Sequence, residues 1–87
     1  MITWEVVGVE SISRQDFHFR GSYHKEIYSC YVHIELSNGV KAHGHGSAWS
    51  WGPSSDAEET AVRRAYGHLY HEVIPRLKTQ YGKLRRV

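Results

Sequence analysis

The sequence lacks the features of secreted and membrane proteins. It has a single cysteine, Cys30, so no internal disulfide can form, which favours a reducing compartment and a cytoplasmic location. It has no unbroken apolar run of about 18 residues and no basic, apolar leader at its start, so we expect neither membrane spanning nor export. Internal repeats, linkers and low-complexity tracts are also missing. With 87 residues, the chain is predicted to form one small domain over residues 1–87.

The net charge is also small, at +2, but acidic and basic residues are separated along the chain. Residues 1–59 hold four basic and eight acidic side chains, for a local charge of −4. Residues 60–87 hold seven basic side chains against Glu72 alone, for +6. Seven histidines can add positive charge in mild acid. The basic second part suits a polyanionic partner.

Strands are predicted in the first half of the chain. Residues 26–37 alternate between a mainly apolar face and a face that carries Ser29, His33 and Glu35, as expected for a half-buried strand. Residues 3–10 predict an earlier strand, in which Gly8 marks a bulge or a close approach. Residues 11–24 fit either a mobile loop or the continuation of that strand into a hairpin arm. The apolar face of the alternating strand consists of Tyr28, Cys30, Val32, Ile34 and Leu36.

The turn after this strand decides its register with the next one, predicted over residues 40–49. A two-residue loop at Asn38-Gly39 would mix charged and apolar side chains on one face of the sheet. A three-residue connection, with Gly39 left-handed, keeps both faces consistent. On the outer face this second register pairs Glu35 with Lys41, His33 with His43, and Tyr31 with His45.

A helix is predicted over residues 55–74. Ser55 and Glu58 match a capping box, and acidic residues in the first turn complement the helix dipole. One apolar stripe should lie on the sheet, where the small residues of the third strand leave room for a close approach. The stripe consists of Ala61, Val62, Ala65, Tyr66, Leu69, Tyr70 and Val73.

Pro75 should end or kink this helix near Val73, because its ring clashes with the preceding turn. Residues 76–87 then form a short second segment or a basic tail. Strand, strand, strand, helix predicts an α+β fold, in which a three-stranded antiparallel sheet carries one long C-terminal helix on one face.

This β-β-β-α order resembles double-stranded-RNA-binding domains and the core of eukaryotic-type single-strand annealing recombination proteins. The resemblance covers residues 28–70 and implies the fold of those domains and a nucleic-acid partner. Acidic residues begin the helix here, whereas the RNA-binding family has a basic cluster at that point. The local features that carry the resemblance are the alternating strand over residues 30–39, Gly44 and Gly46, and Ala57, Ala61 and Ala65.

We predict a small, non-enzymatic nucleic-acid-binding protein that needs no cofactor. A basic helix end and tail can neutralise the phosphates of DNA or RNA without reading sequence. On the outer sheet face, Tyr31, Trp49 and Trp51 can stack on unpaired bases. The same cations also fit a solvated tail near the negative helix end, or a surface for an acidic protein. The expected phosphate contacts are Arg63, Arg64, Arg76, Lys78, Lys83, Arg85 and Arg86.

The alternative is a protein-interaction module, such as a phage or bacterial adaptor or inhibitor, that uses the outer sheet face. Trp49 and Trp51 either cover the open end of the core or form an exposed anchor for a partner. No membrane partner is expected. Unpaired sheet edges in a small chain also favour homo-oligomerisation.

Neither a metal site nor a catalytic centre is predicted. His33, His43 and His45 share one face and are the only zinc candidates, but no cysteine or carboxylate accompanies them at a recognisable spacing. His68 and His71 are expected behind the sheet from that trio. Cys30 faces the predicted core, where burial raises the pKa of a thiol and makes it a poor nucleophile.

Overall fold

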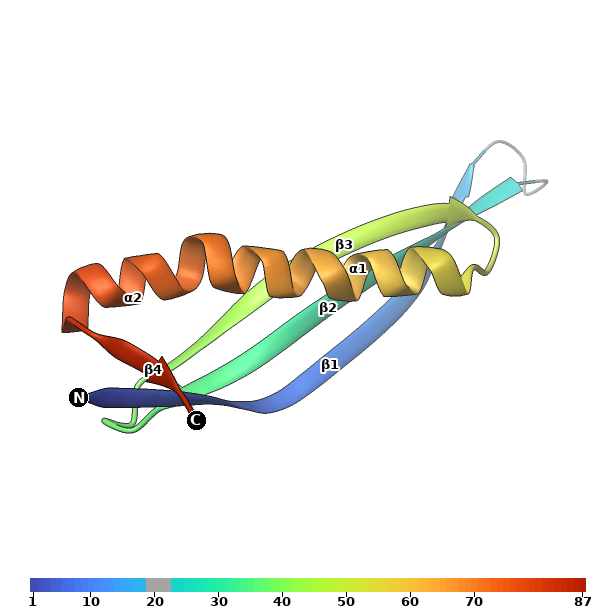
Figure 1. Cartoon of the computed structure of the whole chain (residues 1–87). Helices are drawn as coiled ribbons and strands as arrows, with labels where there is room; N and C mark the ends of the chain where they lie inside the picture. Colours follow the sequence, from blue (N-terminus) through green and yellow to red (C-terminus); the bar gives the residue numbers. More distant parts are fainter. Residues whose placement is uncertain (19–22) are drawn as a thin grey trace.

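Three antiparallel strands and one long helical rod form two layers (Figure 1). The computed structural model describes residues 1–18 and 23–87. The α+β class and the β-β-β-α order are confirmed, and a short fourth strand is added to the sheet, whose order is β3-β2-β1-β4. The elements are β1 (Ile2–His18), β2 (Tyr23–Leu36), β3 (Lys41–Trp51), α1 (Ser55–His68), the π-helical segment η1 (Leu69–Val73), α2 (Ile74–Tyr81) and β4 (Leu84–Arg86).

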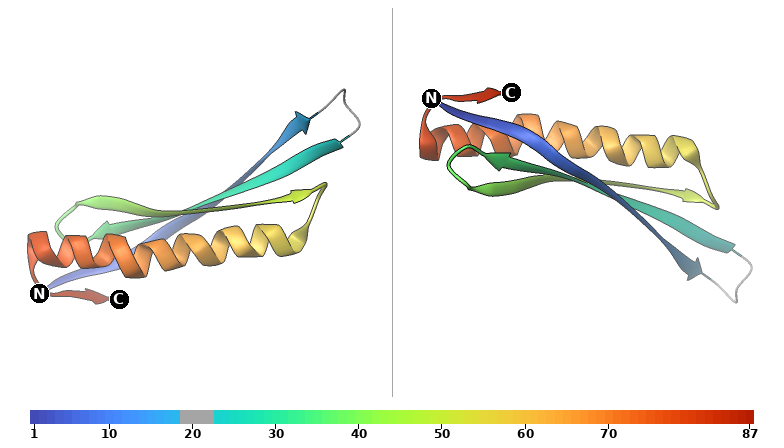
Figure 2. Two further views of the ribbon diagram at one scale, coloured as in Figure 1. Left: turned by 90° about the horizontal axis from the view of Figure 1, so that it is seen from above. Right: turned by 90° about the horizontal axis from the view of Figure 1, so that it is seen from below.

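The first two strands form a long hairpin arm that extends past the start of the helix (Figure 2). β1 continues well beyond residue 10, where the sequence predicts its end. The hairpin alternative for residues 11–24 is confirmed for residues 11–18 and 23–24, and residues 19–22 lie outside the described part. A β-bulge shifts the register between Val6 and Gly8, beside the glycine that the sequence marks. The arm gives the molecule an elongated shape, with extents of 55 × 19 × 18 Å.

The β2–β3 register agrees with the prediction from the turn. Glu35 faces Lys41, His33 faces His43 and Tyr31 faces His45. Gly39 has a φ of +89°, and the loop is closed by a 2.8 Å hydrogen bond from the Leu36 N–H to the Val40 carbonyl. The alternation therefore sends every second residue of β2 into the core. The fully buried ones are Cys30, Val32, Ile34 and Leu36.

The helix packs on the inner face of β2 and β3, where glycines allow direct backbone contact. A Cβ atom added to Gly44 would lie 2.5 Å from the Ala65 carbonyl oxygen. One added to Gly46 would collide with the backbone of Ala61 and Ala65. Both alanines are buried, so the small residues of strand and helix fit one another as predicted.

The helix begins one residue earlier than the predicted capping box. Ser54, not Ser55, is the N-cap: its backbone is extended and its hydroxyl accepts a 3.2 Å hydrogen bond from the Ala57 N–H. Tyr28 fixes this choice, because its hydroxyl accepts a 2.9 Å hydrogen bond from the Ser54 N–H. Ser55 is already helical, so the reciprocal bond predicted for Glu58 is not formed.

Pro75 does not end the helix: of the two predicted outcomes near Val73, a stop or a kink, the stop is wrong. Residues Leu69–Val73 widen into a π-helical turn in which the Ile74 N–H bonds to the Leu69 carbonyl. Proline lacks the N–H that an α-helix would use and crowds the carbonyl four residues earlier. A wider turn just before it relieves that conflict. The rod then continues as α2 to Tyr81, with Ile74 and Leu77 buried.

The last residues are not a free basic tail. Gly82, at a φ of +85°, reverses the chain, and β4 then pairs in parallel with the start of β1, with Leu84 opposite Ile2 and Arg86 opposite Trp4. Within the described residues, no helix is long and apolar enough to cross a membrane.

Candidate functional site

Five of the seven predicted phosphate contacts line two depressions of the surface. Arg63 and Arg64 line a depression of about 510 Å³ on α1, which we call the α1 depression. Lys78, Lys83 and Arg85 line a second one, of about 340 Å³, which we call the terminal depression. The α1 depression is completed by Thr60, Gly67 and His68, and the terminal depression by Met1 and Leu84.

The terminal depression is assembled from three elements. α2 supplies Lys78 in its last turn, the Gly82 reversal brings Lys83 back, and β4 supplies Arg85 beside the amino-terminal residue Met1. Leu84 is half-buried against the core and anchors this arrangement. Within the described residues, none of the three cations forms a salt bridge to a carboxylate. They are therefore available to an external anion.

Two residues of the α1 depression bind the free edge of β3. Arg64 donates a 2.8 Å hydrogen bond to the Ser47 carbonyl, and His68 Nδ1 accepts a 3.0 Å hydrogen bond from the His45 N–H. Glu72 lies 3.3 Å from His68 Nε2 on the other side of the ring. His68 thus binds the backbone of the strand that carries His43 and His45, while the helix itself lies behind the sheet from the side chains of the trio, as predicted.

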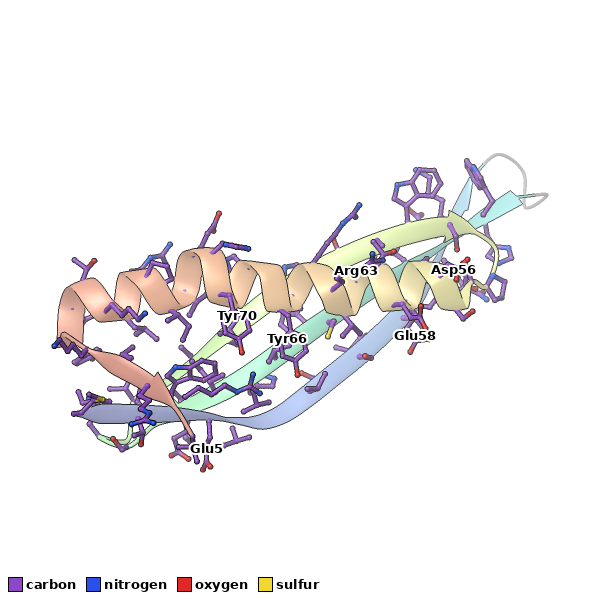
Figure 3. The ribbon with its side chains drawn as sticks, in the orientation of Figure 1. Glu5, Asp56, Glu58, Arg63, Tyr66 and Tyr70 are labelled. Carbon is purple, nitrogen blue, oxygen red and sulfur yellow. The ribbon has the colours of Figure 1, made fainter. Side chains whose placement is uncertain are left out.

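Arg63 and Arg76 remain at the helix surface. Arg63, labelled in Figure 3, donates only to the Thr60 hydroxyl, at 3.3 Å, and Arg76 is exposed on α2. Neither forms a salt bridge to a carboxylate among the described residues. Both can turn toward a phosphate, and Arg63 would give up only its bond to Thr60.

Arg86 differs from the other cations because its side chain packs on aromatic residues of the fold. Its guanidinium lies 5.3 Å from the centre of the Trp4 ring and donates to the Tyr70 hydroxyl. Trp4 and Tyr70 also meet edge to face at 5.7 Å, and Tyr70 itself is 41% exposed. Tyr70 therefore does not join the buried stripe as predicted. Tyr70, labelled in Figure 3, covers Trp4 together with Arg86.

The outer sheet face carries the histidine trio around a central tyrosine. The Tyr31 ring lies 4.8 Å from His45, 5.8 Å from His43 and 6.3 Å from His33, between centroids. His33 also lies 3.4 Å from a carboxylate oxygen of Glu10 on β1. The rings pack on Tyr31, and no group of three His, Cys, Asp or Glu side chains in residues 1–18 and 23–87 could hold a metal ion.

The two tryptophans at the end of β3 are exposed. Trp49 is 51% and Trp51 61% exposed, and their rings meet edge to face at 5.3 Å. Lys25 on β2 places its ammonium 4.2 Å from the centre of the Trp49 ring. They do not cover the core, so the first of the two alternatives for Trp49 and Trp51 is wrong.

Cys30 lies on the inner face as predicted. It is 1% exposed, and burial raises the pKa of its thiol from the ordinary 9.0, although a hydrogen bond with Ser11 acts in the opposite direction. A thiol in this state is mostly protonated at neutral pH.

The sequence misses the two contacts of α1 with the edge of β3. Arg64 and His68 are four residues apart and so share a helix face, as Ser47 and His45 do on the strand, but only the packing of the helix brings the two faces together. Comparison with known proteins found no match: no protein-family model, no curated protein and no solved structure is significantly similar to the chain.

Proposed function

We propose that the protein is a non-enzymatic nucleic-acid-binding protein that holds phosphates at the terminal depression and along the exposed side of the helix. The observation that carries this proposal is the set of unpaired cations. From residue 60 onward the chain has seven lysines and arginines and one carboxylate, Glu72, whose neighbour is His68. Lysines and arginines left without carboxylates are suited to neutralising phosphates.

The spacing of these cations suits an extended polyanion. Arg63 and Lys78 are 15 positions apart on one helical rod, which corresponds to about 22 Å at 1.5 Å per residue. Double-stranded nucleic acid advances about 3.4 Å per base pair, so this length matches about six base pairs. A ligand of that length can span the distance between these two cations along the rod.

Salt dependence is the direct test. Anisotropy of labelled single-stranded and duplex oligonucleotides should show binding that weakens steeply between about 50 and 200 mM salt. Lys83→Glu and Arg85→Glu should each weaken binding at low salt and reduce the slope against salt by about 1. Lys41→Glu, the same charge change on β3, is the matched control and should bind like the wild type. No binding at the lowest salt would refute the proposal.

A second function, a protein-interaction module, is favoured by one observation: two adjacent tryptophans exposed at the end of β3. Large exposed aromatic side chains are typical anchors of protein interfaces. In this case Trp49→Ala should abolish co-purification with a cellular protein while the circular dichroism spectrum stays unchanged. Val7→Ala, which shortens an exposed side chain on β1, is the control and should retain the partner.

A further inference from the structure

The two long edges of the sheet differ in whether their outward-facing backbone groups have partners. At the β3 edge, Arg64 and His68 bind the outward-facing backbone groups of Ser47 and His45. Such contacts hinder a further strand from pairing there. At the opposite edge, β4 pairs only with Ile2–Trp4, so among the described residues no strand covers β1 from residue 5 to residue 18. An open edge of this length invites another strand.

The alternation of hydrogen bonds shows which groups of β1 face outward. Leu36 bonds to Val40, so even-numbered residues of β2 bond to β3 and odd-numbered ones bond to β1. Beyond the bulge, the β1 partners of those odd-numbered residues are even-numbered, such as Glu10 opposite Tyr31. Odd-numbered residues of β1 therefore direct their N–H and C=O groups away from β2. They are Val9, Ser11, Ser13 and Gln15.

The side chains on the outer face of this edge are complementary to those of a second copy of the same segment that runs in the opposite direction. On the outer face, Glu10, Ile12 and Arg14 follow at every second position, and Ile12 is 48% exposed. Glu10 approaches only His33, and Arg14 has no hydrogen bond or ion pair within the described residues. An acid, an isoleucine and a base, evenly spaced, match the same three residues running in the opposite direction.

We propose that the β1 edge is a homodimer interface, at which a second copy of the chain adds its own β1 antiparallel to the first. In the register we assign, Ile12 faces Ile12 of the partner subunit on the two-fold axis. Glu10 then faces Arg14 of the partner subunit, and symmetry repeats this pair. Ser11 faces Ser13 of the partner subunit, and these residues exchange the main-chain hydrogen bonds.

Other two-fold registers fit worse. Hydrogen bonding requires odd-numbered residues of one β1 to face odd-numbered residues of the other. The two-fold axis must therefore pass through a residue, and neighbouring registers differ by one residue in the position of the axis. An axis at Glu10 or at Arg14 opposes like charges, and an axis at Ser13 opposes Glu10 to Asp16. An axis at Ser11 places Ile12 against Glu10. Only the axis at Ile12 pairs opposite charges and buries the isoleucine.

The assembly follows from this register. The sheets of the two subunits join into one, with β1 beside β1 at its centre, and both helices lie on the same face. The pairing segment, residues 8–16, ends at the bulge and stops short of β4. This inference does not depend on nucleic-acid binding, because the terminal depression lies at the other end of β1.

Sedimentation equilibrium of the full chain, free of nucleic acid and at low salt, tests the proposal. The wild type should dimerise, and Arg14→Glu should raise the dimer dissociation constant about tenfold or more, because two pairs become repulsive. The double variant Glu10→Arg, Arg14→Glu restores both pairs and should recover the dimer. Lys41→Glu, with the same charge change on β3, should not alter it. A monomer at all concentrations, or a dimer that Arg14→Glu leaves unchanged, would overturn the proposal.

Cross-linking tests the register separately. Facing residues of a non-hydrogen-bonded antiparallel pair lie about 4.5 Å apart between Cα atoms, within the range of a disulfide. Ile12→Cys should therefore form a disulfide-linked dimer on mild oxidation, whereas the buried Cys30 of the wild type should not. Ser47→Cys, on the bound β3 edge, is the control. Cross-linking through Ser47→Cys alone would place the contact at the wrong edge and contradict the inference.

Discussion

His68 accepts a hydrogen bond from the backbone N–H of His45 through Nδ1, at 3.0 Å, and thereby joins the helix to the outer edge of β3. The neighbouring Glu72 carboxylate, 3.3 Å from Nε2, favours the tautomer in which Nε2 carries the proton and Nδ1 is free to accept. A side chain of the helix thus occupies a position that a further strand would otherwise use.

Removal of this side chain should expose the His45 amide. We expect His68→Ala to lose about 1 kcal/mol of unfolding free energy, the usual net value of one hydrogen bond. Exchange of the His45 amide proton, followed by NMR, should accelerate about fivefold relative to wild type. His71→Ala, an exposed neighbour on the same helical rod, should leave that amide unchanged. Equal protection of the His45 amide in both variants would contradict the contact.

Gly46 should tolerate no side chain. A Cβ atom there would collide with the backbone of Ala61 and Ala65, so Gly46→Ala should lower the unfolding free energy by about 2–3 kcal/mol. At Gly67, by contrast, an added Cβ meets nothing within 4 Å, and Gly67→Ala should stabilise the helix by about 0.5–1 kcal/mol. Urea unfolding of the two variants measures both effects. The same sign for both would show that the helix does not pack on β3 as described.

Arg86 and Arg85 are neighbours with different roles. Arg86→Ala removes the guanidinium from Trp4 and Tyr70 and should cost about 1–2 kcal/mol of stability. Arg85→Ala should change stability by less than about 0.5 kcal/mol, because this side chain is exposed in the terminal depression. Arg86→Ala should therefore lower thermal stability more than Arg85→Ala does, whereas Arg85→Ala should weaken oligonucleotide binding more than Arg86→Ala does. Thermal unfolding and oligonucleotide binding of both variants test this. A stable Arg86→Ala protein would contradict the structural role of Arg86.

Cys30 should make the protein less stable in alkali. Burial raises the pKa of its thiol above 9.0, so above that pH the unfolded chain loses this proton while the folded chain keeps it. The unfolded state then binds fewer protons, and the unfolding free energy falls as the pH rises. Comparing the wild type with Cys30→Ala between about pH 8 and 10 isolates this contribution, because the tyrosines titrate in both. Parallel stability curves would contradict it.

Alternation and turn chemistry were sufficient to predict the buried face of β2 and its pairing with β3. The period-two pattern of β2 identified the buried Cys30, Val32, Ile34 and Leu36, and Gly39 fixed the register with β3. Both signals are local, since each depends on neighbouring residues in one segment. The same register predicts that Tyr31 faces His45 and that His33 faces His43, and both pairs are confirmed.

The features that the sequence did not predict depend on long-range contacts. Ser54 caps the helix because Tyr28, 26 positions earlier, binds its N–H. Pro75 lies within a helix because the buried Ile74 and Leu77 keep the rod on the core despite a π-helical turn. β4 forms because Ile2, at the other end of the chain, offers a strand edge. In each case tertiary packing outweighs local preference.

The sequence predicted which cations belong to the site but not how they are arranged in space. Charge counting identified all seven cations, because charge does not depend on folding. It could not separate Lys83 and Arg85, which line the terminal depression, from Arg86, which is also exposed but contacts Trp4. That distinction required the pairing of β4 with β1.

The pairing of β4 with β1 also sets an order of events in folding. Residues 2–4 meet residues 84–86, so this corner of the sheet can close only after residue 86 has left the ribosome. The closure spans almost the whole chain and carries the largest loop entropy of any contact in the sheet. Three residue pairs hold it, so it should also be the first part to open under mild denaturant. The terminal depression, which depends on this corner, would then be both the last surface to form and the first to be lost.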